Sequence, residues 1–227
     1  MPIPKSTQTD STVNRFIKNG LIYAELNEYF TKEFYADGYA GCEIFHNSIP
    51  MRIYLKVSKP TAEVIGTNKC RIKQVRSLIA KRLGMADNDV DILVEMIKKK
   101  GLCPFTQAVN IAQRLLVNAS VRRAVYSSIR AAKEEGAQGI EVIVSGKTKG
   151  QRARSTKFID GLMIHSGQPA KDYVKTGFTA VEMRQGVIGI KVKIMLPYDP
   201  EGIIGPNKVM ADKVIVFEPK DSEVATF

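Results

Sequence analysis

The order of helical and strand-like segments in residues 13–97 constrains the fold more than any other feature. Residues 13–35 place apolar side chains at broadly helical spacing, and two β-rich runs follow around a turn at residues 47–50. Further along, a basic amphipathic helix turns an apolar stripe inward and leaves its cations mostly outside. The predicted helices and strands, in chain order, lie at 13–35, 42–45, 52–57, 60–65, 70–83 and 90–97.

A glycine-containing loop, Gly66-Thr67-Asn68-Lys69, joins the last two of these helices. The element order, with one extra helix at the front, is similar to that of a type II KH domain, whose GxxG loop holds a nucleic-acid backbone. Lys69 stands where KH domains have glycine, and lysine enters positive φ less readily. We therefore expect contact with an rRNA backbone more than a free single-strand clamp, and a loop that merely turns the chain stays open as an alternative. The predicted RNA-backbone residues are Gly66, Thr67, Asn68, Lys69, Arg71, Lys73 and Arg76.

Positive charge is concentrated in the second half of the chain. The 34 Lys and Arg residues outnumber the 23 Asp and Glu residues, which gives a net charge of +11. Residues 1–95 are nearly balanced, whereas residues 96–227 hold most of the excess. Exposed helix faces usually mix both signs, so long tracts without any acid favour contact with a polyanion such as RNA. Three such tracts lie at residues 69–82, 96–133 and 147–157.

The second half reads as a separate α+β domain of two helices on a mostly antiparallel sheet. Ser120 is expected to cap the second helix, which would place Arg122 and Arg123 in its first turn. Cations are unfavourable at that end of the helix dipole, and an external anion would relieve the cost. The glycine-punctuated connection that follows the first strand suits insertion into folded RNA. Its predicted rRNA-binding residues are Lys147, Lys149, Arg152, Arg154 and Lys157.

The chain should therefore divide into two folded parts and their connections. After Pro197 the pattern loosens, and we expect an extended C-terminal arm that docks on a partner, with a strand-like segment at 214–217; a disordered end stays open as an alternative. The expected parts are a polar leader at 1–12, the type II KH domain at 13–97, a linker at 98–104, the second α+β domain at 105–197 and the tail at 198–227.

Several function classes do not fit the sequence. The apolar runs are too short to cross a membrane, and the first ten residues resemble neither a secretory signal nor a transit peptide, so a cytoplasmic protein is expected. Three cysteines without a CxxC pair support neither a disulfide framework nor a metal site. Gly146-Lys147-Thr148 lacks the glycine that a P-loop needs at position 141, so we expect no nucleotide cofactor.

An enzyme would have to rest on Asp160, His165 and Ser166 as base, acid and nucleophile. A histidine beside Ser-Gly after a strand is more often part of a turn or an RNA contact, so we do not expect catalysis. A free KH-type RNA regulator is the stronger alternative. It would need an intact GxxG loop with base-stacking aromatic residues nearby, and this loop shows neither.

Longer motifs carry a specific resemblance. The chain resembles the universal ribosomal protein S3 family of the small subunit, and is closest to the eukaryotic cytosolic form. The resemblance extends over residues 20–220 and is carried by the stretches LNE (26–28), DGY (37–39), GAQG (136–139), VSGK (144–147), GQRA (150–153), DGLMIHSG (160–167) and RQGVIGIKVKIMLP (184–197).

The resemblance implies a structural constituent of the head of the small ribosomal subunit. Its expected partners are rRNA, neighbouring head proteins and mRNA, with no membrane and no small-molecule substrate, and a eukaryotic member would pass through the nucleus during assembly. Arg122 and Arg123 match the arginines that line the channel where mRNA enters, which the family links to holding single-stranded mRNA, passive unwinding and start-site accuracy. Some members are credited with an abasic-site lyase activity. Gln138 stands where those members have lysine, so that activity is not expected here.

Overall fold

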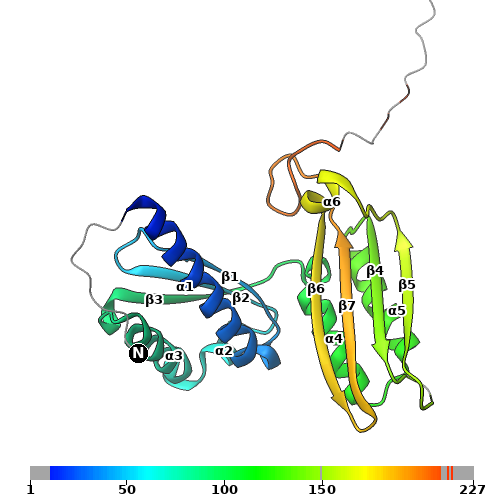
Figure 1. Cartoon of the computed structure of the whole chain (residues 1–227), viewed down its shortest axis with the longest axis horizontal. Coiled ribbons are helices and arrows are strands. Elements are labelled where there is room, and N and C mark those ends of the chain that lie inside the picture. The colour runs from blue at the N-terminus through cyan, green and yellow to red at the C-terminus, as the bar shows by residue number, and fades with distance from the viewer. Residues whose placement is uncertain (1–10, 149, 211–213, 215, 217–227) are drawn as a thin grey trace, which may run out of the picture.

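The computed structural model describes residues 11–148, 150–210, 214 and 216. These residues form two mixed domains that follow one another along the chain (Figure 1). Within the described ranges, no helix combines the length and the apolar character that a membrane span requires.

The first domain is a three-stranded sheet with helices that pack on one face. Strand β1 pairs with β2 in the antiparallel sense, and β2 pairs with β3 in the parallel sense, in the order β1-β2-β3. A parallel pair needs a crossover, which α2 and α3 provide. This order confirms the predicted KH architecture. The elements are α1 (Thr12–Glu33), β1 (Tyr39–Phe45), β2 (Met51–Val57), α2 (Thr61–Ile65), α3 (Cys70–Leu83) and β3 (Val90–Met96).

The core of this domain lies between the sheet and the three helices. Strand β2 buries every second side chain, as expected for a strand with one covered face. Phe30 of α1 and Phe34, the C-cap residue that directly follows the helix, are fully buried beside them, because they lie about one helical turn apart on the same side. The helix contributes Leu26 to the same cluster, while α3 contributes Val75 and Ile79.

The second domain has two layers, a four-stranded antiparallel sheet and a pair of helices behind it (Figure 1). The strands lie in the order β5-β4-β7-β6, so β4 and β7, which are far apart in the sequence, form the centre. A short helix, α6, was not predicted from the sequence. The elements are α4 (Pro104–Leu116), α5 (Val121–Glu134), β4 (Gly139–Gly146), β5 (Arg154–Gly161), α6 (Gly167–Tyr173), β6 (Val174–Met183) and β7 (Gly186–Met195).

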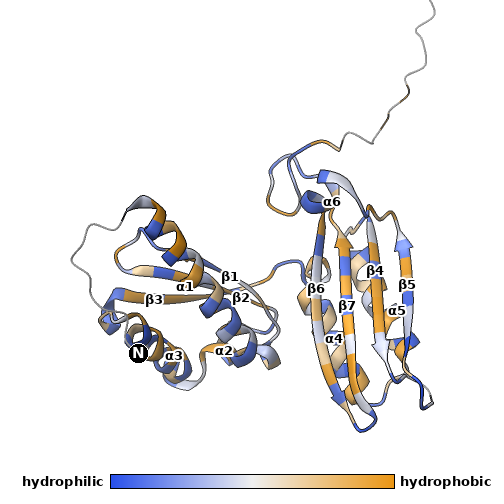
Figure 2. Ribbon diagram, viewed as in Figure 1, coloured by the Kyte–Doolittle hydropathy of each residue, from blue (hydrophilic) through white to orange (hydrophobic). Residues whose placement is uncertain are grey.

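Only one face of this sheet is covered by α4 and α5. Val142 and Val144 of β4, with Ile190 and Val192 of β7, are fully buried against the helices. Figure 2 shows hydrophobic residues along β4 and β7, interrupted by hydrophilic ones. The alternate residues of all four strands point to the opposite side, and no helix of the described chain lies over them (Figure 1).

The junction between the domains is packed. In the expected linker, a 3-10 turn at Lys100–Leu102 places Gly101 and Leu102 in the interior. The Gly101 amide donates to Glu135 Oε2 at 2.7 Å, and a Cβ at Gly101 would stand 2.5 Å from the Ala131 carbonyl oxygen. The domains also meet through a hydrogen bond from Thr179 Oγ1 to the Tyr35 hydroxyl oxygen, at 3.1 Å.

The first part of the expected C-terminal arm lies against the second domain. The Asp199 carboxylate accepts hydrogen bonds from the backbone amides of Ile204, Glu201 and Ile203, at 2.8, 3.0 and 3.1 Å. These bonds hold the pKa of Asp199 below its usual range, and the bond from the Ile204 amide contributes most. In the expected strand at 214–217, Val214 and Val216 have no regular secondary structure, and the other two positions lie outside the described residues.

Candidate nucleic-acid interface

The KH loop adopts a backbone that departs from ordinary helical geometry at three of its four positions. Gly66 has φ 76° and ψ 172°, and Asn68 and Lys69 follow with φ values of 53° and 59°. Lysine therefore takes the left-handed conformation that glycine would enter without strain. Thr67, Asn68 and Lys69 are exposed, and no side chain caps the start of α3 among the described residues. The loop presents a lysine and open backbone to the solvent.

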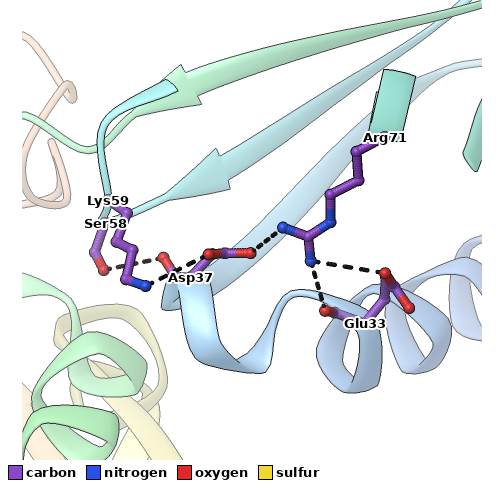
Figure 3. Close-up of polar contacts among 5 residues, drawn as sticks. All are labelled: Glu33, Asp37, Ser58, Lys59 and Arg71. Carbon is purple, nitrogen blue, oxygen red and sulfur yellow. Dashed lines mark hydrogen bonds and ion pairs between the residues drawn. The ribbon is translucent and has the colours of Figure 1, made fainter. Parts of the chain in front are cut away.

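Arg71, one of the predicted RNA-backbone residues, is engaged in contacts within the first domain. Its Nη1 donates to Asp37 Oδ2 at 2.7 Å, and its Nη2 donates to the Glu33 carbonyl oxygen at 3.1 Å (Figure 3). The guanidinium also lies 4.7 Å from the centroid of the Phe34 ring. Lys59 reaches the other Asp37 oxygen at 3.6 Å. Arg71 therefore ties α3 to the end of α1, and its expected contact with RNA stays a prediction.

The next two cations on α3, Lys73 and Arg76, differ in how exposed they are. Lys73 is exposed and has no acidic partner within the described part of the chain. Arg76 is only partly exposed, and its Nε is buried without a hydrogen-bond partner among the described atoms. Lys69 and Lys73 are thus the most accessible cations around this loop.

The start of α5 has the geometry expected from the sequence. Ser120 is the N-cap, and its hydroxyl oxygen accepts a hydrogen bond from the Arg123 amide at 3.4 Å. This confirms that Arg122 and Arg123 lie in the first turn, where the chain places no acidic residue. Both side chains are exposed. The positive end of the helix dipole and two guanidinium groups therefore face the solvent together.

A groove of about 730 Å³ brings Arg122 together with cations from three other places in the chain. Lys147 comes from the loop after β4, Arg154 from the start of β5, and Arg184 from the β6–β7 turn. Four cations face one acid, Glu182, so the groove is strongly electropositive. Its apolar lining includes Leu115, Leu116, Phe158, Met183 and Ile188.

Aromatic contacts fix the position of Arg122 at the edge of this groove. Its guanidinium carbon lies 5.7 Å from the centroid of the Tyr126 ring, one turn along α5. Tyr126 in turn meets Phe158 edge to face, with the ring centroids 6.0 Å apart. Because Phe158 belongs to β5, this chain of contacts links the helix to the sheet and holds the arginine over the groove.

The structure separates the residues that the sequence grouped as rRNA-binding. Lys147 and Arg154 line the groove with Arg122, while Arg152 is exposed outside it. Lys157 lies on the opposite face of the sheet, with its Nζ 3.0 Å from Glu141 Oε1. Lys149 falls outside the described residues. Reasoning from the sequence missed Arg184 as a groove residue; its position beside the Gln185-Gly186 turn was the only available signal.

The three residues considered for catalysis do not meet. Asp160 forms an ion pair with Lys133 of α5, on the helix side of the sheet. His165 turns to the other side, where its Nδ1 lies 3.6 Å from Glu141 Oε2. Ser166 is the residue before α6 and makes no side-chain cap there. The arrangement contains no nucleophile and base within hydrogen-bond reach of one another among these residues.

Comparisons with known proteins agree with this two-domain arrangement. The family model described as KH domain matches residues 25–102, and the model described as Ribosomal protein S3, C-terminal domain matches residues 111–194. The chain is also similar to the small ribosomal subunit protein uS3 of Encephalitozoon cuniculi (strain GB-M1). The two sequences are 47% identical over 213 residues, which cover 94% of this chain and 98% of the relative.

Proposed function

The chain belongs to the ribosomal protein S3 family, and from this premise we propose that it is a structural constituent of the small ribosomal subunit head that lines the channel where mRNA enters. Membership of the family makes it a ribosomal protein of the small subunit that binds RNA. The location at the channel, the hold on mRNA and the support of start-site accuracy are the finer parts of the proposal.

The single observation that carries the mRNA role is the groove beside the first turn of α5. Three arginines and a lysine converge on it from segments far apart in the chain, and Arg122 is held there by Tyr126. Guanidinium groups contact phosphates without reading bases, so such a groove would bind single strands regardless of sequence. Strand separation at the groove would then be passive, because the phosphate contacts would only hold a strand that has already opened, and no catalytic residue or cofactor is needed.

The remaining cations would bind rRNA and keep the protein in place. Lys69 and Lys73 at the KH loop, together with Arg152 beside the groove, are exposed and face no acid within the described residues. A backbone contact of this kind fixes position and carries no base specificity. The other partners would be neighbouring head proteins. The protein would work in the cytoplasm, after passage through the nucleus if its source is eukaryotic.

The mRNA role is tested by Arg122→Glu combined with Arg123→Glu in the full-length chain. Both side chains are exposed, so we expect the variant to fold and to sediment with the small subunit, because its rRNA contacts remain. Crosslinking to a mRNA that carries 4-thiouridine at the entrance should fall severalfold. Arg130→Glu is the matched control, since Arg130 is also exposed on α5 but does not line the groove.

Two outcomes would contradict the proposal in different ways. Wild-type crosslinking by the double variant would remove Arg122 and Arg123 from the mRNA path. A wild-type chain that stays at the top of the sucrose gradient, or that leaves the subunit readily at high salt, would remove the structural role and favour a free RNA regulator.

A further inference from the structure

The face of the second domain's sheet that points away from α4 and α5 has a regular pattern of side chains. The register of the four strands brings these residues into rows that run across the sheet. One row alternates cations with apolar groups, and its members, from β5 to β6, are Lys157, Ile143, Lys191 and Phe178. The next row along the strands is Ile159, Glu141, Lys193 and Thr176. The row on the other side consists of small residues, which are Ser155, Ser145, Gly189 and Ala180.

Large apolar side chains stand exposed on this outer sheet face. Phe178 is 62% exposed and Ile159 is 53% exposed, although each lies on a strand with covered residues on its other side. The Phe178 ring lies over Gly189, where an added Cβ would be 3.5 Å from the ring edge. The two side chains stand on the two edge strands of the sheet, β6 and β5, so a partner would have to span all four strands to cover both.

The three rows of the outer sheet face carry one acid, Glu141, and it pairs with two of the three lysines there. Glu141 is buried, with Lys157 Nζ 3.0 Å and Lys193 Nζ 3.7 Å from its Oε1. Lys191 differs from both, because no acid of the described residues lies within ion-pair distance of it. It stands directly between Ile143 and Phe178 in its row. The face therefore offers one unpaired cation surrounded by apolar groups.

We propose that the outer sheet face binds a neighbouring protein whose surface places a carboxylate between apolar side chains. The carboxylate would pair with Lys191, and the apolar side chains would cover Phe178 and Ile159. The proposal rests on the assignment of this chain to the small subunit, since that assembly supplies the neighbour. It adds a protein-binding surface to the RNA-binding groove on the helix side of the same domain.

The pattern fits a protein better than the other two occupants. A second copy related by a two-fold axis would bring Lys157, Lys191 and Lys193 against the same three lysines, which repel. RNA would meet Glu141 beside two of the lysines, and would leave the apolar groups only partly covered. The groove differs, because its three arginines and its lysine form no ion pair with its one acid, Glu182, among the described residues and stay available to phosphates.

The area of the outer sheet face indicates whether it could hold a partner by itself. Four strands about 4.8 Å apart and about five residues along each strand span roughly 300 Å². A stable complex of two free proteins buries about 800 Å² on each partner. The outer sheet face would therefore be one of several contacts within the assembled subunit, where the other contacts hold the two proteins close.

The test is a photo-crosslink inside purified small subunits. Phe178→p-benzoylphenylalanine places the reactive group on the β6 side of the face, next to Lys191, and Tyr126→p-benzoylphenylalanine is the matched control, because Tyr126 is a half-exposed aromatic on the helix side. We expect the probe at Phe178 to crosslink to a peptide of another head protein, with Asp or Glu near the site of attachment. The probe at Tyr126 should not give the same product.

A second change tests the role of charge. Lys191→Glu should lower the yield of that crosslink severalfold, and Lys191→Gln should lower it less, while both chains still sediment with the small subunit. A crosslink from Phe178 to rRNA, to a second copy of this chain or to nothing would overturn the proposal. So would a crosslink that Lys191→Glu leaves unchanged. Sedimentation is measured first. A chain that is absent from the subunit would count against the proposed function. A chain that is present in the subunit but gives no crosslink from Phe178 would count against the contact at the outer sheet face alone.

Discussion

The contacts of Arg71 with Asp37 and Glu33 lead to a prediction about stability that a residue engaged only with RNA would not share. We consider Arg71→Met, which keeps most of the aliphatic stem and removes the guanidinium. The change leaves Asp37, whose side chain is 9% exposed, with Lys59 at 3.6 Å as its remaining cation. It also leaves the Glu33 carbonyl oxygen without its donor.

The magnitude follows from the contacts that are lost. A hydrogen bond between charged groups contributes about 1.5–3 kcal/mol, and the cation over the Phe34 ring contributes about 0.5–1 kcal/mol. We therefore expect the first domain to lose about 3 kcal/mol of unfolding free energy. With a urea dependence of about 1.5 kcal/mol/M for a domain of this size, its midpoint should fall by roughly 2 M.

Urea unfolding of the full chain, followed by circular dichroism, would measure the midpoint. Hydrogen exchange of the β2 amides would show that the loss belongs to the first domain. The matched control is Arg82→Met, because its ion pair with Glu25 is about half exposed at both ends and should matter little. A wild-type midpoint for Arg71→Met, accompanied by weaker binding to rRNA, would refute the structural role and leave Arg71 as an RNA contact.

Two further predictions concern single side chains. Burial pushes the pKa of Glu141 upward, but Lys157, Lys193 and His165 outweigh it, so the net pKa lies below the ordinary value. The resulting stabilisation is complete above the unfolded pKa and is lost as the pH falls through the folded pKa; Glu141→Gln should thus show a flatter loss of thermal stability between about pH 6 and 3. Lys69→Gly should raise the urea midpoint of the first domain, because glycine relieves about 1 kcal/mol of left-handed strain. An unchanged or lower midpoint would show that Lys69 is not strained.

Local patterns were enough to predict most of the fold. Alternation in β7, where Ile188, Ile190 and Val192 are buried, marks a half-covered strand as plainly as the helical spacing marks α4 and α5. Helix α6 escaped prediction because it has seven residues, includes Pro169 and buries only Tyr173, so it has no apolar period.

The candidate site could be predicted only where its residues lie close together in the sequence. Arg122 and Arg123 could be placed in the first turn of α5 because Ser120 precedes them in the chain. The contacts of Arg71 could not be predicted, because its partner Asp37 lies 34 residues earlier and faces it only after the domain has folded. Arg184 joins the groove because β7 lies beside β4, and this pairing of distant strands leaves no local trace in the sequence.

The strand order of the second domain also determines when its sheet can form during synthesis of the chain. The first domain has all its strands once Met96 has been made, whereas the central β4–β7 pair of the second domain needs the chain as far as Met195. At about 5–20 residues per second, the intervening stretch of about 100 residues takes roughly 5–20 s. From the synthesis of β4 until that of β7, β4 has a free edge, and the turn that carries Arg184 has not formed for most of this time. The nascent chain can therefore present its KH loop to RNA well before it possesses the groove.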